Sequence, residues 1–258
     1  MNIQELSIQM KLPYSKNHYR EYIAEAEHTK MTYEEFLLGL LEREYELRKN
    51  NGVKSRTKQA KFPYLKYLED FDRRKYARDF WSKFDDLEKL NFIDKKENLI
   101  LIGTPGSGKT HYSIGLAVKA IMRGKSVLFV SVPNLIIELK EALSQHQLNM
   151  YKKKFEKYDL VILDELGYIS FDKSGSEILF NLLSNRNDKG SIIITSNLTF
   201  DRWNEIFNDT MLTGALVDRL AHRAHILDIS LENSVRFEDT IAWLKNQGTE
   251  TKPEKDVN

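Results

Sequence analysis

A glycine-rich segment, GTPGSGKT, has the residue types and spacing that bind phosphate. It fits the pattern G-x-x-x-x-G-K-[ST] between an apolar run and a helical pattern. Glycines let successive backbone N–H groups converge on a phosphate, and the start of the following helix adds positive charge. Because a chance glycine turn would lack this strand and helix context, we expect a site for ATP. Its binding residues are Gly103, Thr104, Pro105, Gly106, Ser107, Gly108, Lys109 and Thr110.

Two side chains of this loop have chemical roles beyond binding. Lys109 neutralises the β- and γ-phosphate oxygens and so counts as catalytic, and the Thr110 hydroxyl is expected to bind Mg²⁺. A second acidic segment completes the metal site, because Asp164 and Glu165 follow the apolar run Leu160–Leu163. Adjacent carboxylates repel each other unless a cation or a polarised water lies nearby. We expect Asp164 to support Mg²⁺ and Glu165 to act as general base; the alternative is a solvated strand end.

Three further residues are candidates for contacts with the nucleotide. Asn197 ends the apolar run SIIITSN, where an amide can orient the attacking water or contact the γ-phosphate, although a Ser-Asn end is often a simple turn. Arg219 lies four residues before Arg223 on an expected helix and can stabilise the phosphate of a neighbouring subunit. From the residues alone, a surface pair with Asp218 is the favoured role of Arg219. Arg236, at the start of the last expected helix, is a weaker candidate.

The elements that must position these residues form an α/β pattern. Four short runs are apolar on both faces, as buried parallel strands are: NLILIG, SVLFVSV, YDLVILD and SIIITSN. Helical stretches alternate with them, which predicts a parallel sheet flanked by helices. We expect a helical N-terminal DNA-binding and oligomerisation domain (1–75), an ATPase domain (76–247) and a disordered tail (248–258). In the first domain a helix begins at the Thr32–Glu35 capping box and is expected to stop at Asn50–Gly52.

The composition excludes several classes of protein. The chain has 258 residues, no cysteine and a formal net charge of +1, so it has no disulfides and no thiolate metal site. Its N-terminus has no long apolar core, and no apolar run approaches the ~20 residues of a membrane span. We expect a soluble cytoplasmic protein.

Taken together, these motifs resemble the IstB-type ATPases of bacterial insertion sequences. The phosphate loop followed by His111, LVILDELGYISFDKSGSEILFNLLSNR, GSIIITSNLTFDRWNEIF and LVDRLAHRAH carry the resemblance. That family belongs to the AAA+ superfamily and is related to DnaC-type helicase loaders. GTPGSGKT and ENSVR stand where family members often carry GPPGTGKT and GESYR, and no separate helical lid is evident.

The resemblance implies specific roles for residues already singled out. It makes Glu165 the catalytic glutamate, Asn197 the sensor 1 residue and Arg219 the arginine finger, and it adds His111 to the nucleotide-binding residues. It also implies a homo-oligomer with ATP sites at subunit interfaces, assembly on DNA, and stimulation of a cognate transposase.

A basic segment, residues 48–66, predicts contact with DNA. It contains seven Lys or Arg and no acidic residue. By itself such a run of charge is usually a solvated face. Together with the resemblance it favours salt-sensitive, largely sequence-independent binding to double-stranded DNA. The expected contacts are Arg48, Lys49, Lys54, Arg56, Lys58 and Lys61. The resemblance therefore implies an ATP-dependent transposition helper. Two alternatives remain open: a loader of a replicative helicase, and a nucleotide-dependent DNA scaffold without turnover.

Overall fold

The computed structural model describes residues 1–186 and 188–230. The chain forms two compact units, Met1–Lys58 and Gln59–Asn258. The expected tail, the end of the expected ATPase domain and the candidate Arg236 lie outside the described residues. Within the described ranges, no helix combines the length and the hydropathy needed to cross a lipid bilayer.

The first unit consists of three helices, α1 (Ile3–Gln9), α2 (Pro13–Thr29) and α3 (Tyr33–Gln59). A buried carboxylate joins the last two, because Glu44 accepts hydrogen bonds from the backbone N–H groups of Tyr14 and Ser15, both at 3.0 Å. This carboxylate satisfies donors at the start of α2 that have no partner within the helix. Tyr22 of α2 stacks on Phe36 of α3 with ring centroids 5.0 Å apart. Polar capping, this aromatic pair and the ion pair of Arg43 with Glu25 thus hold α2 against α3.

The predicted boundaries of α3 are half right. Thr32 and Glu35 form the expected capping box, with the Thr32 N–H donating to Glu35 at 2.8 Å. The expected stop at Asn50–Gly52 is wrong, since the helix continues to Gln59 and Lys61 then adopts a positive φ of 58°. A glycine inside a helix costs only about 1 kcal/mol relative to alanine, which does not end a helix by itself.

The second unit is built on a five-stranded parallel sheet with the order β2-β3-β4-β1-β5. The register pairs Leu99 with Ile193 and Val127 with Leu160. The strands are β1 (Asn98–Ile102), β2 (Val127–Ser131), β3 (Leu160–Leu166), β4 (Ser191–Ser196) and β5 (Ala224–Asp228). This confirms the predicted α/β class. The sheet also contains β5, which is not among the four strands predicted from the sequence.

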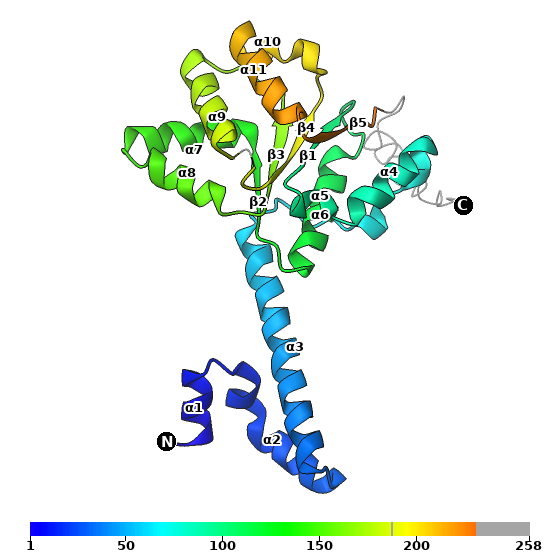
Figure 1. The fold of residues 1–258 in the computed structure, drawn as a ribbon, viewed down its shortest axis with the longest axis vertical. Helices are drawn as coiled ribbons and strands as arrows, with labels where there is room; N and C mark the ends of the chain where they lie inside the picture. The colour runs from blue at the N-terminus through cyan, green and yellow to red at the C-terminus, as the bar shows by residue number, and fades with distance from the viewer. Residues whose placement is uncertain (187, 231–258) are drawn as a thin grey trace, which may run out of the picture. The chain divides into compact units, whose positions relative to one another are not determined.

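Helices cover both faces of this sheet (Figure 1). Alternate strand residues such as Ile100, Val161 and Ile194 pack in one core with α7, α9 and α11, and their neighbours Leu99, Leu101 and Ile193 are fully buried on the other face. The helices are α4 (Asp79–Glu88), α5 (Asn91–Asp94), α6 (Lys109–Met122), α7 (Val132–Ser144), α8 (Leu148–Glu156), α9 (Lys173–Arg186), α10 (Asn204–Phe207) and α11 (Thr210–Ala221), with 3-10 turns η1 (Leu68–Asp70), η2 (Arg73–Lys75) and η3 (Phe200–Arg202).

The segment 59–75 belongs to the second unit, which moves the expected domain boundary from residue 75 to residue 58. Ala60 is fully buried, and its carbonyl accepts a hydrogen bond from the Phe129 N–H of β2 at 2.8 Å. Leu68 packs against Gly115 of α6, where a Cβ would lie 2.8 Å from a Leu68 methyl carbon. The ring centroids of Phe71 and Tyr112 lie 5.0 Å apart. The apolar side chains of this segment thus pack on the ATPase sheet and α6.

Candidate functional site

The phosphate loop connects β1 to α6 and already has the shape that its function requires. Gly106 and Gly108 have positive φ values of 79° and 85°, a region that side chains other than glycine rarely adopt. The Lys109 ammonium donates to the carbonyl oxygens of Gly103 at 2.7 Å and Thr104 at 2.9 Å. The loop is therefore wrapped around the lysine at the N-terminal end of α6, which is a favourable place for an anion.

A buried tyrosine supports the loop from below. The Tyr76 hydroxyl donates to the Ser107 carbonyl at 2.5 Å. A Cβ on Gly108 would lie 2.6 Å from the same hydroxyl oxygen, so only glycine fits against it. Burial raises the pKa of Tyr76 far above its usual value, which keeps the hydroxyl protonated as a donor. Tyr76 therefore supports the phosphate loop, a role that no sequence motif predicted.

The expected metal pair is in contact. Thr110 is the second residue of α6, after Lys109, and its hydroxyl donates to Oδ1 of Asp164 at 2.9 Å. Asp164 is 5% exposed, whereas its neighbour Glu165 is exposed. Hydroxyl and carboxylate oxygens are hard donors of the kind Mg²⁺ prefers, and Mg²⁺ commonly takes only one or two carboxylates in addition to substrate phosphates. The Thr110–Asp164 pair therefore fits a magnesium ion.

A β-bulge separates the two acidic residues. In the β3–β4 pairing, Leu163 lies opposite Ile194 and Leu166 lies opposite Ser196, so Asp164 and Glu165 together face the single residue Thr195. Glu165 has a φ of 65°. A bulge of this kind bends the strand and changes where its side chains point. It buries Asp164 and leaves Glu165 exposed at the loop.

A pocket collects seven of the expected site residues together with four that were not expected. It is lined by Tyr64, Lys66, Gly106, Ser107, Gly108, Lys109, Thr110, His111, Glu165, Tyr168 and Thr195. His111 also contacts the Tyr67 carbonyl at 2.9 Å. This contact joins the segment 59–75, called the linker below, to the phosphate loop. Tyr64 and Lys66 come from the basic segment assigned to DNA, and Tyr168 and Thr195 lie within the quoted motifs. The sequence does not show the path of residues 59–75, which brings Tyr64 and Lys66 to the pocket. It also does not show the β-bulge opposite Thr195.

Asn197 lies outside this pocket lining. It follows β4, and its buried Oδ1 has no hydrogen-bond partner among the described residues. A Cβ on Gly167 would lie 2.8 Å from that oxygen, so the glycine makes room for the amide. A role of Asn197 at the γ-phosphate stays a prediction.

Arg219 is not among the residues that line the phosphate pocket of its own chain. Its guanidinium donates to the Ser184 hydroxyl at 2.6 Å and lies 4.6 Å from the centre of the Phe180 ring. These α9 contacts replace the expected pair with Asp218. Arg223 lies beyond the end of α11, so the expectation that both arginines share one helix face is wrong; it contacts Asp188 at 3.2 Å. Arg219 remains exposed.

The expected DNA-binding residues occupy different environments. Arg48 lines a groove of the first unit with Lys11 and Lys16. These two lysines are not among the DNA-binding residues predicted from the sequence. In the helical geometry of α3, residues seven apart share a side, so Lys49 lies with Arg56. Lys54 and Lys58, which are exposed, are four apart and lie on a different side. The basic segment is therefore not one continuous face.

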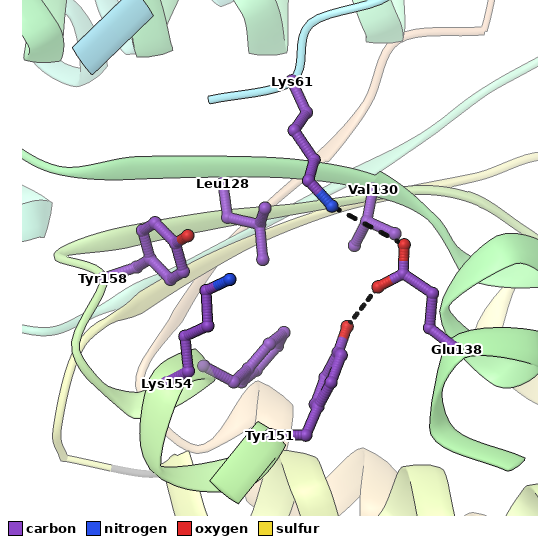
Figure 2. A pocket seen from close by; sticks show the side chains of 8 residues that line it. Lys61, Leu128, Val130, Glu138, Tyr151, Lys154 and Tyr158 are labelled. Atoms are coloured by element: carbon purple, nitrogen blue, oxygen red, sulfur yellow. Dashed lines mark hydrogen bonds and ion pairs between the residues drawn. The ribbon is translucent and has the colours of Figure 1, made fainter. Parts of the chain in front are cut away.

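Lys61 is part of a separate pocket in the second unit. Its ammonium lies 3.8 Å from Glu138, whose other oxygen accepts a hydrogen bond from the Tyr151 hydroxyl at 2.7 Å (Figure 2). Lys154 and Tyr158 also line this pocket. The Lys61 side chain is still 61% exposed in this ion pair. Its role in DNA binding stays a prediction.

Comparisons with known proteins give a family and a fold. The family model described as IstB-like ATP binding protein matches residues 6–241. The chain is 36% identical over 238 residues to the insertion sequence IS21 ATP-binding protein of Pseudomonas aeruginosa, covering 90% of this chain and 87% of that protein. It is 32% identical over 231 residues to the IS5376 ATP-binding protein of Geobacillus stearothermophilus, covering 90% and 92%.

Solved structures with the same arrangement of strands and helices include replication proteins. The structure of DnaI has a TM-score of 0.54 at 22% identity, covering 63% of this chain and 90% of that chain. The replication initiator DnaA, solved with AMPPCP and single-stranded DNA, has a TM-score of 0.55 at 20% identity, covering 72% and 56%. These likenesses confirm the predicted AAA+ P-loop fold.

Proposed function

The chain belongs to the family of IstB-like ATP binding proteins, and on this premise we propose that it is an ATPase that assembles on DNA and assists a transposase. The names of its relatives place them in insertion sequences. The observation that carries the proposal is the contact of the Thr110 hydroxyl with Asp164 beside the phosphate loop, with Glu165 exposed next to it. This arrangement suits phosphoryl transfer to water.

Each residue of the site has a separate role in the proposed hydrolysis of ATP. The loop N–H groups and Lys109 hold the β- and γ-phosphates, and Thr110 and Asp164 would hold Mg²⁺, which neutralises charge on the phosphates when bound. Glu165 takes a proton from a water whose oxygen bonds to the γ-phosphorus. The bond from that phosphorus to the β–γ bridging oxygen breaks, leaving ADP and phosphate. Asn197 orients the same water in this proposal.

The exposed Arg219 supports a site completed by a second copy of the chain. Its guanidinium is fixed by Ser184 and Phe180 on α9, outside the lining of its own pocket. An arginine supplied by a neighbouring subunit stabilises charge on the transferring phosphate and raises the rate ~10³- to 10⁵-fold in P-loop enzymes. The N-terminal unit offers a further contact, because Leu37, Leu41 and Tyr45 of α3 are spaced four apart and more than half exposed.

The contact with double-stranded DNA is assigned to cations of the first unit and the linker. Lys11, Lys16 and Arg48 gather at one groove, and α3 carries further basic residues towards its C-terminus. Such cations bind phosphates and release counterions, so affinity depends on salt more than on sequence. ATP binding stabilises the DNA-bound oligomer and hydrolysis dismantles it. We expect this cycle in the cytoplasm.

A reconstituted strand-transfer reaction tests the proposal. Purified chain, ATP, Mg²⁺, target DNA and a transposase of an IS21-type insertion sequence should give more insertion products than the transposase alone. Co-purification with a replicative helicase, and no effect on the transposase, would favour the helicase loader instead. ATP-dependent DNA binding without measurable release of phosphate would favour the scaffold.

A further inference from the structure

The β-bulge in β3 leaves two acidic residues to be held by one residue of the neighbouring strand. Asp164 and Glu165 together lie opposite Thr195 of β4, where a regular ladder would have one residue opposite one. A bulge removes ladder hydrogen bonds, and a buried backbone N–H without a partner is unfavourable. The Glu165 N–H therefore needs an acceptor other than a β4 carbonyl.

The Thr195 hydroxyl supplies that acceptor and also acts as a donor. It accepts from the Glu165 N–H at 3.0 Å and donates its proton to Oδ1 of Asp164 at 2.6 Å. A hydroxyl has one proton and two lone pairs, so one side chain can make both bonds. Thr195 is 1% exposed, which prevents water from taking its place easily. Glu165 has a φ of 65°, a conformation that persists only when its surroundings fix it.

These two bonds act on different groups of the candidate site. The bond to Asp164 fixes the carboxylate that also accepts from Thr110, so Oδ1 receives two hydroxyl protons. The bond to Glu165 fixes the backbone from which the exposed carboxylate extends. One hydroxyl thus sets the position of the expected magnesium ligand and of the expected general base.

We propose that Thr195 is the positioning residue of this ATPase, and that it holds Asp164 and Glu165 in register for hydrolysis. The inference rests on the proposed function. In this proposal Thr195 is the residue of β4 that holds the two acidic residues in place. Asn197, two residues further along the chain, lies against Gly167 instead. Thr195 also lines the phosphate pocket, and in this proposal it acts through the two acids.

Ser196 provides a matched control. It is also fully buried on β4, and its hydroxyl donates to the Leu166 carbonyl at 2.7 Å and accepts from the Leu198 N–H at 3.1 Å. Ser196→Ala therefore removes a buried hydroxyl with one donor and one acceptor contact from the next residue, but without a bond to either acid. The test compares Thr195→Val, which keeps the shape, Thr195→Ser, which keeps the hydroxyl, and Ser196→Ala.

The first readout is steady-state ATP hydrolysis by the full chain on DNA. Loss of a residue that orients a metal ligand costs activity on the order of 10- to 100-fold. Thr195→Val should lower kcat by that factor with KM changed less than about threefold, while Thr195→Ser and Ser196→Ala stay near wild type. Equal loss in Thr195→Val and Ser196→Ala, or no recovery with serine, overturns the positioning role. If Thr195→Val does not fold, Thr195→Ala takes its place.

The second readout does not depend on turnover. The Mg²⁺ concentration that gives half-maximal binding of AMPPNP should rise about tenfold in Thr195→Val, because Asp164 loses the orienting donor that Thr195 supplies. It should stay unchanged in Thr195→Ser and Ser196→Ala. An unchanged magnesium requirement in Thr195→Val contradicts the proposal. A wild-type chain that binds AMPPNP but never releases phosphate contradicts the proposed ATPase, and the magnesium titration still decides the role of Thr195.

Discussion

The hydroxyl of Thr110 donates a hydrogen bond to Oδ1 of Asp164 at 2.9 Å, although the two residues are 54 positions apart in the chain. This contact joins the start of α6 to the end of β3 and places both expected magnesium ligands beside Lys109. It depends on the parallel sheet, because β1 and β3 both end at this edge with β4 between them.

Lys109→Ala should abolish stable ATP binding. The ammonium holds two loop carbonyls and is the main positive charge expected at the phosphates, and hydrogen bonds to charged groups contribute about 1.5–3 kcal/mol each. We expect the dissociation constant for ATP, measured by calorimetry, to rise about 100-fold or more. Lys119→Ala, in the last turn of the same helix, is the control and should bind normally. Normal affinity in Lys109→Ala would contradict the assignment of the loop.

Glu165→Gln should bind ATP and fail to hydrolyse it. Only the proton acceptor is lost, so phosphate release should fall about 10²- to 10⁴-fold while ATP affinity is kept. The variant should accumulate as DNA-bound assemblies that persist in electrophoretic mobility assays. Glu177→Gln, an exposed residue of α9, is the control. Wild-type turnover in Glu165→Gln would show that another group is the base.

Alkaline unfolding should report on the buried Tyr76. Burial raises its pKa in the folded chain, so the unfolded state loses this proton first, near pH 10. The stabilising contribution is complete below that pH and is lost as pH rises above it, by up to about 1.4 kcal/mol per pH unit. Urea unfolding of Tyr76→Phe should show a shallower fall above pH 10 than wild type. The same change at the fully exposed Tyr33 should leave the slope as it is; equal slopes in all three proteins would contradict the role of burial.

Arg186→Met should destabilise the second unit. The buried guanidinium donates to the carbonyls of Phe155, Tyr158 and Ser191 at 2.7, 2.7 and 3.1 Å, and methionine leaves all three without this donor. We expect a loss of about 3 kcal/mol in the free energy of unfolding, measured by urea denaturation. Arg202→Met, whose side chain is about half exposed, should cost less than about 1 kcal/mol. A loss below that in Arg186→Met would contradict a structural role.

The salt dependence of DNA binding should separate the two groups of cations. Neutral substitutions at Lys11, Lys16 and Arg48 should reduce the slope of log affinity against log salt by about 0.9 for each lost phosphate contact. The triple variant at Lys54, Arg56 and Lys58 measures the contribution of the end of α3. An unchanged slope in both variants would move the DNA surface to the ATPase unit.

Much of this site followed from the sequence because its motifs are local. The phosphate loop needs only one strand, one turn and one helix, and β3 carries both acids at its end. The contribution of Thr195 depends on a bulge, and that of Tyr64 on the path of the linker, neither of which follows from hydrophobic periodicity. Strand β5 was missed because Ala224–Asp228 follows α11 after only two residues and alternates weakly. The end of α3 was predicted too early because Asn50–Gly52 has the composition of a helix stop, whereas a glycine inside a helix costs only about 1 kcal/mol relative to alanine.

The central claim, an ATPase whose site is completed by a second copy, is tested most directly by mixing Arg219→Ala with Glu165→Gln on DNA. Each variant alone should bind ATP and release little phosphate. In mixed oligomers, an intact Arg219 meets an intact Glu165 at some interfaces, and hydrolysis should recover at intermediate ratios. No recovery at any ratio, with mixed oligomers verified by cross-linking, would contradict a site shared between subunits.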